Sequence, residues 1–264
     1  MIDTPGSLLT DMRAIAPLVH CITNYVAMNV AANVLLAAGA SPAMVHAPEE
    51  TEEFAGISGA LTINIGTLSA PWVEGMRRAI RSAATAGKPW VLDPVAHFAT
   101  DYRRRTVAEL MAQKPTIVRG NASEIIALAG GTSQGQGVDS GDPVEAAEDA
   151  ARTLATRHGA VFAVTGPTDY VTDGSRTARI FGGSPLMPQV TALGCALTCL
   201  IGAHVATTPS DPFEATVAAL ATFAVAGERA GRATGPGSFA WQFLDHLAAL
   251  DGAGLDDDAR IERS

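Results

Sequence analysis

A loop of small residues delivers one thiol to the start of an apolar, helix-compatible run in the second half of the chain. Ala192, Leu193, Gly194 and Cys195 open this run, which continues to Ala203. Free backbone N–H groups at a helix N-terminus favour negative charge, so this segment could hold a phosphoryl group. The same position would lower the pKa of the Cys195 thiol. A plain buried helix with an inert cysteine is the alternative, because cysteine is often buried.

Other side chains that could do chemistry lie where a short apolar run stops and a helical pattern begins. They are Asn24, Asp93, Arg119 with Glu124, and Thr165 with Gly166. In open α/β sheets, ligands bind at the edge formed by the carboxyl ends of the strands. We therefore expect these residues to converge with the cysteine loop at one edge of a sheet.

The elements that must position these residues alternate along the chain. Short apolar runs predict strands at 18–22, 43–46, 60–65, 90–92, 116–118 and 161–164. Amphipathic patterns predict helices at 25–38, 49–57, 71–86, 102–113, 121–129 and 143–157. A tight turn at 173–174 indicates a hairpin, and the pattern after residue 192 is almost entirely helical. This alternation predicts an α/β fold, a three-layer α/β/α sandwich around a mostly parallel sheet.

Size and composition limit the class of protein. The chain has 264 residues, 47% of them hydrophobic, which is enough to bury a substantial core as a single domain over residues 1–264. The polar end, residues 252–264, is expected to fray, and the Gly-, Ser- and Gln-rich segment 130–142 to form a flexible loop. No run is long enough to cross a membrane, and the first residues lack the features of a signal peptide.

Cysteine usage and charge narrow the class further. Three cysteines do not suggest a disulfide framework, so a cytoplasmic protein is expected. A net charge of −9 argues against a nucleic-acid partner but leaves room for a nucleotide ligand, which needs only a local positive patch. The P-loop pattern G-x-x-x-x-G-K-[ST] is absent from the sequence, so a nucleotide would not be held in that manner.

A series of short motifs, running in order from about His20 to Phe239, resembles hydroxyethylthiazole kinases, the thiamine-salvage members of the ribokinase-like superfamily. The motifs are H-C-I-T-N at 20–24, G-A-S-P-A-M at 39–44, L-T-I-N-I-G-T-L at 61–68, L-D-P-V at 92–95, R-G-N-A-S-E at 119–124, V-T-G at 164–166, G-C at 194–195 and G-P-G-S-F at 235–239. Each is weak alone, but together in this order they are specific. The resemblance implies a ribokinase-like fold, phosphorylation of the primary alcohol of 4-methyl-5-(2-hydroxyethyl)thiazole with ATP and Mg²⁺, and a homotrimer with thiazole sites between subunits.

The same resemblance implies a role for each candidate residue. Cys195 stands where thiazole kinases have cysteine and most ribokinase-like kinases have an aspartate base. The backbone amides of Leu193, Gly194 and Cys195 would bind the transferred phosphoryl group. The remaining roles are Asp93 and Glu124 near Mg²⁺, directly or through water; Arg119, Thr165 and Gly166 for ATP; and Met44, Ala192 and Asn24 for the thiazole.

The chain departs from this family pattern in the cysteine loop and after the L-D-P-V motif. Ala192 and Leu193 stand where the family has G-A or G-S, and Ala96 stands where it has glycine. Alanine fits at 192 if its φ is negative, and Leu193 would narrow the phosphate pocket if it points inward. Two alternatives stay open: a ribokinase-fold enzyme for another small vitamin-related substrate, and a catalytically weakened sensor of nucleotide or thiazole.

Several candidates also have a purely structural interpretation. Arg119 could pair with Glu124 at the surface, where such pairs contribute little. Asp93 could form a turn before Pro94, and Met44 could fill the core. His20, Cys21 and Cys199 are interpreted as packing residues.

Overall fold

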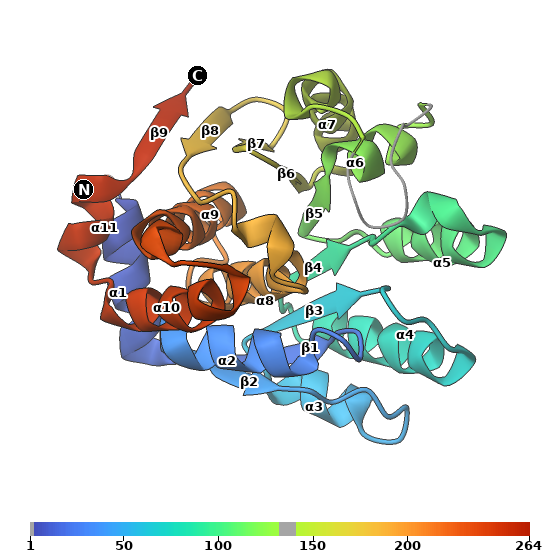
Figure 1. The fold of residues 1–264 in the computed structure, drawn as a ribbon. Coiled ribbons are helices and arrows are strands. Elements are labelled where there is room, and N and C mark those ends of the chain that lie inside the picture. Colours follow the sequence, from blue (N-terminus) through green and yellow to red (C-terminus); the bar gives the residue numbers. More distant parts are fainter. Residues whose placement is uncertain (1–2, 132–140) are drawn as a thin grey trace.

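The computed structural model describes residues 3–131 and 141–264. The helices lie on both faces of a central sheet, so the predicted three-layer α/β/α architecture is confirmed (Figure 1). Most of the predicted loop 130–142 lies outside the described residues.

The sheet has nine strands in the order β2-β1-β3-β4-β5-β6-β7-β8-β9. The first six strands run parallel to one another, and the last three pair antiparallel in turn. Their bounds are β1 Leu18–Ile22, β2 Ser41–Ala43, β3 Ala60–Asn64, β4 Trp90–Asp93, β5 Ile117–Asn121, β6 Val161–Thr165, β7 Thr168–Thr172, β8 Thr177–Phe181 and β9 Arg260–Arg263. Strands β1 to β6 therefore all end at the same edge, which we call the carboxyl edge.

Two sets of helices cover the two faces, each packed on its own hydrophobic cluster. One face carries α1 Pro5–Ile15, α2 Met28–Ala38, α8 Leu193–Thr207, α9 Pro212–Arg229, α10 Pro236–Ala249 and α11 Gly252–Asp258. The other carries α3 Thr51–Ile57, α4 Ala70–Thr85, α5 Asp101–Ala112, α6 Ala122–Leu128 and α7 Val144–His158. Short 3₁₀ turns lie at His97–Ala99, Met187–Gln189 and Ala230–Arg232.

Helix α8 is buried along most of its length because it lies against the middle of the sheet. It packs on β1, β3 and β4 and is flanked by α2 and α9 (Figure 1). Gly202 permits this close approach, since a Cβ there would lie 2.4 Å from Cγ2 of Thr62. The sheet thus fixes where the first turn of α8 stands.

Several predicted element boundaries are shifted in the structure. The helix expected from residue 25 begins at Met28, and the strand expected at 43–46 lies at Ser41–Ala43. Strand β2 pairs only with β1, at an edge of the sheet where Pro42 is tolerated. Because β2 runs parallel to β1, the residues that follow it, beginning with Met44, lie at the carboxyl edge.

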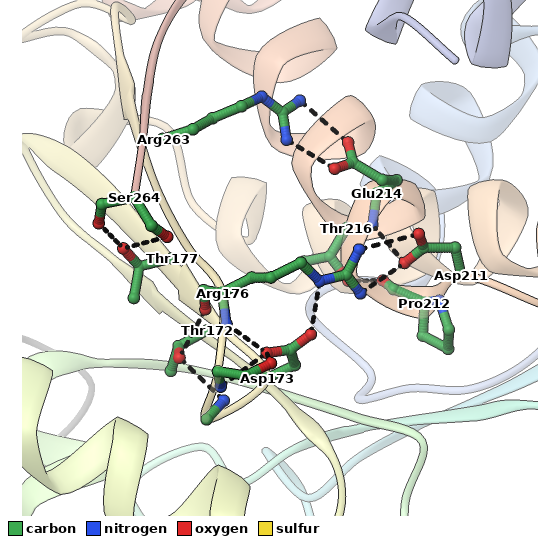
Figure 2. A network of polar contacts seen from close by, with 12 residues as sticks. Thr172, Asp173, Arg176, Thr177, Asp211, Pro212, Glu214, Thr216, Arg263 and Ser264 are labelled. Atoms are coloured by element: carbon green, nitrogen blue, oxygen red, sulfur yellow. Dashed lines mark hydrogen bonds and ion pairs between the residues drawn. The ribbon is translucent and has the colours of Figure 1, made fainter. Parts of the chain in front are cut away.

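The C-terminal segment does not fray, so the expectation for residues 252–264 is wrong. It forms α11 and then β9, which pairs antiparallel with β8. Ser264 exchanges backbone hydrogen bonds with Thr177, and the Arg263 guanidinium donates to both carboxylate oxygens of Glu214 at 2.6 and 2.9 Å (Figure 2). The tail is ordered because its polar side chains find partners in elements distant in sequence.

Candidate active site

The carboxyl edge gathers the predicted residues from six elements. Asp93 ends β4, Arg119 lies in β5 and Thr165 ends β6. Asn24 lies two residues beyond β1, Glu124 lies in the first turn of α6, and Cys195 lies in the first turn of α8. Parallel strand ends share one edge, so residues up to 171 positions apart in sequence come within hydrogen-bonding distance.

A chain of side-chain amides connects the thiol to a buried carboxylate. Asn24 Nδ2 donates to Cys195 Sγ at 3.4 Å and to Asn64 Oδ1 at 2.8 Å. Asn64 Nδ2 donates in turn to Asp93 Oδ2 at 2.8 Å, as does the Thr198 hydroxyl at 2.8 Å. The thiol and the carboxylate are therefore linked by a continuous series of side-chain hydrogen bonds.

Asn64 and Thr198 are site residues that the sequence interpretation missed. Asn64 ends β3 and so satisfies the same strand-end rule that identified Asp93. Thr198 lies one turn after Cys195 on α8, and the largely apolar sequence of this helix does not indicate which face carries a functional polar residue. The signal for Asn64 was present in the sequence, whereas Thr198 required the orientation of the helix.

Asp93 is a fully buried carboxylate with one oxygen unpartnered. Its side chain is 1% exposed, and Oδ1 has no hydrogen-bond partner among the described residues. Burial raises the pKa of Asp93, and the nearby Arg119 charge opposes that rise. An oxygen held in this way can still accept a ligand.

Arg119 lies between the acidic side of the site and the start of α8. Its Nη1 is 3.6 Å from Asp93 Oδ2, and its Nη2 donates to the Thr165 hydroxyl at 2.5 Å. The guanidinium is 12% exposed and partners Asp93, so the alternative of a surface pair with Glu124 is wrong. A Cβ on Gly194 would lie 2.8 Å from Nη2, which explains why this position has no side chain.

The first turn of α8 has no side-chain cap. Its N-cap, Ala192, makes no side-chain capping bond, so the N–H groups that follow have no side-chain acceptor at the cap. Alanine was expected to fit at position 192 with a negative φ. The observed φ is +65°, in the left-handed region that favours glycine. Leu193 packs in the core and is 6% exposed.

Cys195 has a raised pKa, contrary to the expectation from its helix position. Burial raises the pKa of the Cys195 thiol to about 11, and the Asp93 charge adds to the rise. The opposing influence of Arg119 and of the Asn24 and Asn64 amides is smaller. The thiol is therefore protonated at neutral pH in the unliganded protein.

Glu124 combines a capping role with a position beside the acidic site. Its Oε2 accepts from the Asn121 backbone N–H at 2.8 Å, and its Oε1 accepts from the Ala96 N–H at 2.9 Å. Burial, followed by the Asp93 charge, raises the pKa of Glu124 to about 7. Ala96 itself has φ +46°. Like Ala192, it is an alanine in the left-handed region at a position where the hydroxyethylthiazole kinase motifs have glycine.

The donor set suits a magnesium ion that keeps most of its own ligands. The described residues contain no cluster of three or more acidic, histidine or cysteine side chains that could enclose a metal. Asp93 offers an unpartnered buried oxygen, and Glu124 lies close enough for its pKa to respond to the Asp93 charge. Mg²⁺ commonly binds one or two carboxylates and takes its other ligands from phosphates and water.

Four further residues have surroundings that can be compared with their predicted roles. His20 is buried, its Nε2 lies 2.7 Å from the Val45 carbonyl oxygen, and burial lowers its pKa to about 4, which fits a packing role. Cys21 and Cys199 are buried thiols in the core. Met44 directly follows β2, is half-buried and packs against the core at the rim of the carboxyl edge.

The fold is of a class that kinases of small molecules share. The chain superimposes on a pyridoxal kinase from Staphylococcus aureus in complex with AMP-PCP and pyridoxal with a TM-score of 0.64, covering 94% of this chain and 98% of that one, at 15% identity; this match concerns the fold alone. Residues 9–252 match the hydroxyethylthiazole kinase family. The chain is 71% identical to a hydroxyethylthiazole kinase from Rhizobium rhizogenes over 98% of its own length and 97% of that protein.

A solved structure supports the same assignment. The hydroxyethylthiazole kinase protein from Pyrococcus horikoshii OT3 is 39% identical, with a TM-score of 0.89 and 98% coverage of both chains. The chain belongs to the hydroxyethylthiazole kinase family. Its helices, in the ranges described, include none long and apolar enough to span a bilayer.

Proposed function

We propose that this protein transfers the γ-phosphoryl group of ATP to the primary alcohol of 4-methyl-5-(2-hydroxyethyl)thiazole, as in thiamine salvage. The observation that carries the proposal is the start of α8. There an uncapped helix N-terminus, the Arg119 guanidinium against Gly194 and the Cys195 thiol meet. An anion pocket beside a hydrogen-bonding side chain is what alcohol phosphorylation requires.

The nucleotide side of the proposed site is formed by Arg119, Thr165 and Gly166. Arg119 would donate charge-assisted hydrogen bonds to a phosphate, since its Nε has no partner among the described residues. The Thr165 hydroxyl accepts a hydrogen bond from the guanidinium and helps to fix its position. Gly166 donates its N–H to Asp169 at 3.0 Å, which fixes the turn that follows β6.

The acceptor side is formed by Asn24, Met44 and Ala192. Asn24 holds the thiol through its side-chain amide, and Met44 offers a half-buried apolar surface for a ring. The thiolate form of Cys195 would receive the alcohol proton as the oxygen attacks phosphorus, so the resting thiol must first lose its own proton to solvent. A loose transition state demands little early deprotonation of the alcohol, so the thiolate would take up the proton late in the transfer.

Mg²⁺ would be held by Asp93, with Glu124 in contact directly or through water. A bound divalent cation neutralises phosphate charge that develops during transfer. Asp93 itself is kept in place by Asn64, Thr198 and Arg119, and these contacts leave Oδ1 without a hydrogen-bond partner among the described residues.

We further propose a homotrimer and a cytoplasmic location. Tyr25 and Val26, 67% and 57% exposed, directly follow Asn24 and form an apolar surface beside the acceptor side, as expected if another subunit closes it. All three cysteines are free thiols, which suits a reducing compartment.

A turnover assay tests the proposed activity. We expect ADP formation to depend on the thiazole alcohol and on Mg²⁺, with little ADP formed from matched pyrimidine and pyridine alcohols. Preference for a pyridine or pyrimidine alcohol would assign the same chemistry to another substrate. Nucleotide binding with no alcohol-dependent turnover would refute the kinase activity.

The Cys195 side chain can be tested separately. If the Cys195 thiolate receives the alcohol proton, Cys195→Ser should lower kcat by about 10²-fold, the scale of general-base catalysis, with little change in ATP affinity. Because its pKa lies at about 11, the wild-type rate should rise with pH from 7 to 10. Cys195→Asp should remain active with a flatter profile, since its carboxylate ionises at lower pH. Full activity of Cys195→Ala would contradict the base role and leave only the backbone N–H contribution.

A further inference from the structure

Arg103 makes an unusual set of contacts close to the acidic side of the site. It lies in the first turn of α5, where the Thr100 side chain caps its backbone N–H at 3.3 Å. Its guanidinium donates to three backbone carbonyls: Val95 at 2.8 Å, Ile65 at 3.1 Å and Gly66 at 2.6 Å. No carboxylate of the described chain forms an ion pair with it, and burial lowers its pKa.

Two of these carbonyls belong to peptide groups whose N–H ends bind site residues. The Val95 carbonyl shares a peptide plane with the Ala96 N–H, which donates to Glu124 Oε1 at 2.9 Å. The Ile65 carbonyl shares a plane with the Gly66 N–H, which donates to Asn64 Oδ1 at 2.8 Å. Because a peptide unit is planar, holding its oxygen also sets the direction of its N–H.

The Ala96 backbone adds a reason for the clamp. Its φ of +46° lies in the left-handed region, a conformation that alanine keeps only where the surroundings enforce it. Arg103 and Glu124 hold the two ends of the peptide group directly before this residue. Released from either end, that peptide could rotate and carry its N–H away from the carboxylate.

We infer that Arg103 is a positioning residue of the kinase reaction. It orients the two peptide N–H groups that hold Glu124 and Asn64, and through Asn64 it orients Asp93 and the Asn24–Cys195 contact. It acts on the acidic, metal-binding side of the site and makes no contact with the acceptor pocket. The inference rests on the proposed function, because it assigns Arg103 a part in that reaction.

Arg13 provides a matched control elsewhere in the same chain. Its guanidinium also donates to three carbonyls, those of Ala38, Leu247 and Leu250, and burial also lowers its pKa. These carbonyls lie at the C-terminal ends of α2 and α10, away from the residues of the site. Arg13 and Arg103 therefore make similar structural contacts, but only Arg103 adjoins the site.

The test compares Arg103→Lys with Arg13→Lys in the full-length protein. We expect both to lower Tm by similar amounts, because each loses part of a three-carbonyl contact. At a temperature where both are folded, only Arg103→Lys should lower kcat, by about 10- to 100-fold, and raise the Mg²⁺ concentration for half-maximal rate. Its KM for the thiazole alcohol should stay within about twofold of wild type, since Arg103 reaches the acceptor side only indirectly, through Asn64 and Asn24.

Calorimetry of Mg²⁺·ADP binding gives a readout independent of turnover, and Arg103→Lys should bind it about tenfold more weakly. Arg103→Gln, which can still donate to one carbonyl, serves if the lysine variant does not fold. Kinetics and binding equal to those of Arg13→Lys would overturn the positioning role. An inactive wild-type protein would instead refute the proposed kinase activity, so the two failures are distinguishable.

Discussion

The two ends of the parallel strands each carry an aspartate–arginine network, and the two networks differ in burial and in how fully their polar atoms are paired. At the carboxyl edge, Asp93 is buried and Arg119 is mostly buried, with Arg119 Nη1 3.6 Å from Asp93 Oδ2, and each side chain has one atom without a partner among the described residues. At the other edge, Arg176 donates to both carboxylate oxygens of Asp211 at 2.9 Å and to Asp173 at 2.7 Å (Figure 2). The Arg176 and Asp211 side chains are 46% and 36% exposed.

The pKa values of the carboxylates follow this difference. Burial raises the pKa of Asp93, whereas hydrogen bonds from Arg176 lower the pKa of Asp211. For Asp173, the hydrogen bonds from Arg176 and Ser175 together outweigh burial and lower its pKa to about 2. The exposed network of Arg176, Asp173 and Asp211, which we call the outer network, holds the β7–β8 turn to α9. The buried network of Asp93 and Arg119, which we call the inner network, still has polar atoms that could bind a ligand, as expected at a functional site.

The largest expected effect comes from removing the arginine of each network. Arg119→Ala leaves Asp93 buried without its counter-charge, which should lower the free energy of unfolding at pH 7 by on the order of 3 kcal/mol. It should also lower kcat/KM for ATP by about 10²- to 10³-fold, because a preorganised phosphate donor is lost. Arg176→Ala should cost about 1 kcal/mol and leave the kinetics unchanged, as expected for exposed ion pairs.

Urea unfolding and steady-state kinetics of both variants check this contrast. If Arg119→Ala retained wild-type ATP affinity and rate, Arg119 would be a structural residue only. Equal losses of unfolding free energy in the two variants would show that burial does not make the Asp93–Arg119 pair more important for stability than the exposed pair.

An intermediate effect is expected in the pH dependence of stability. Glu124 has a folded pKa of about 7 against 4.5 in the unfolded chain, so the folded state holds the extra proton between these values. Its contribution to the free energy of unfolding therefore falls as pH rises, by about 1.4 kcal/mol per unit across that window. Glu124→Gln should remove this slope. It should also be about 1–3 kcal/mol less stable than wild type at pH 5, because its NH₂ group faces a backbone N–H.

Asp173→Asn is the control from the outer network. The folded pKa of Asp173 is depressed, so its contribution is present above the unfolded value of 3.8 and is lost as pH falls toward 2. This variant should change stability above pH 4 and leave the slope between pH 5 and 7 as in the wild type. A wild-type slope that persists in Glu124→Gln would assign the titration to another group.

The sequence predicted which candidate residues lie together better than it predicted their pKa values. The strand-end rule identified Asp93, Arg119 and Thr165 correctly as neighbours, because parallel strands bring their ends to one edge whatever the exact register. It could not give the pKa of Cys195, since local helix position lowers this value and burial, a tertiary property, raises it more. The C-terminal strand was missed for a related reason: Arg263 and Ser264 look like a polar tail until Glu214 and Thr177 are placed beside them.

The smallest expected effect concerns backbone strain at the start of α8. Ala192 has φ +65°, where a side chain costs about 1 kcal/mol relative to glycine, so Ala192→Gly should raise the free energy of unfolding by about 0.5–1 kcal/mol. Ala16, with φ +48° at the C-cap of α1, carries similar strain far from the site, and Ala16→Gly should be stabilising by a similar amount. Neither change removes a side-chain hydrogen bond, and Leu193 keeps its place in the core, so kcat should stay within about twofold for both. Urea unfolding measures the first expectation and steady-state kinetics the second. A rise in KM for the thiazole alcohol confined to Ala192→Gly would indicate the proposed contact of the Ala192 methyl group with the ring, whereas a fall in kcat alone would mean that the stiffer alanine backbone helps to hold the anion pocket in shape.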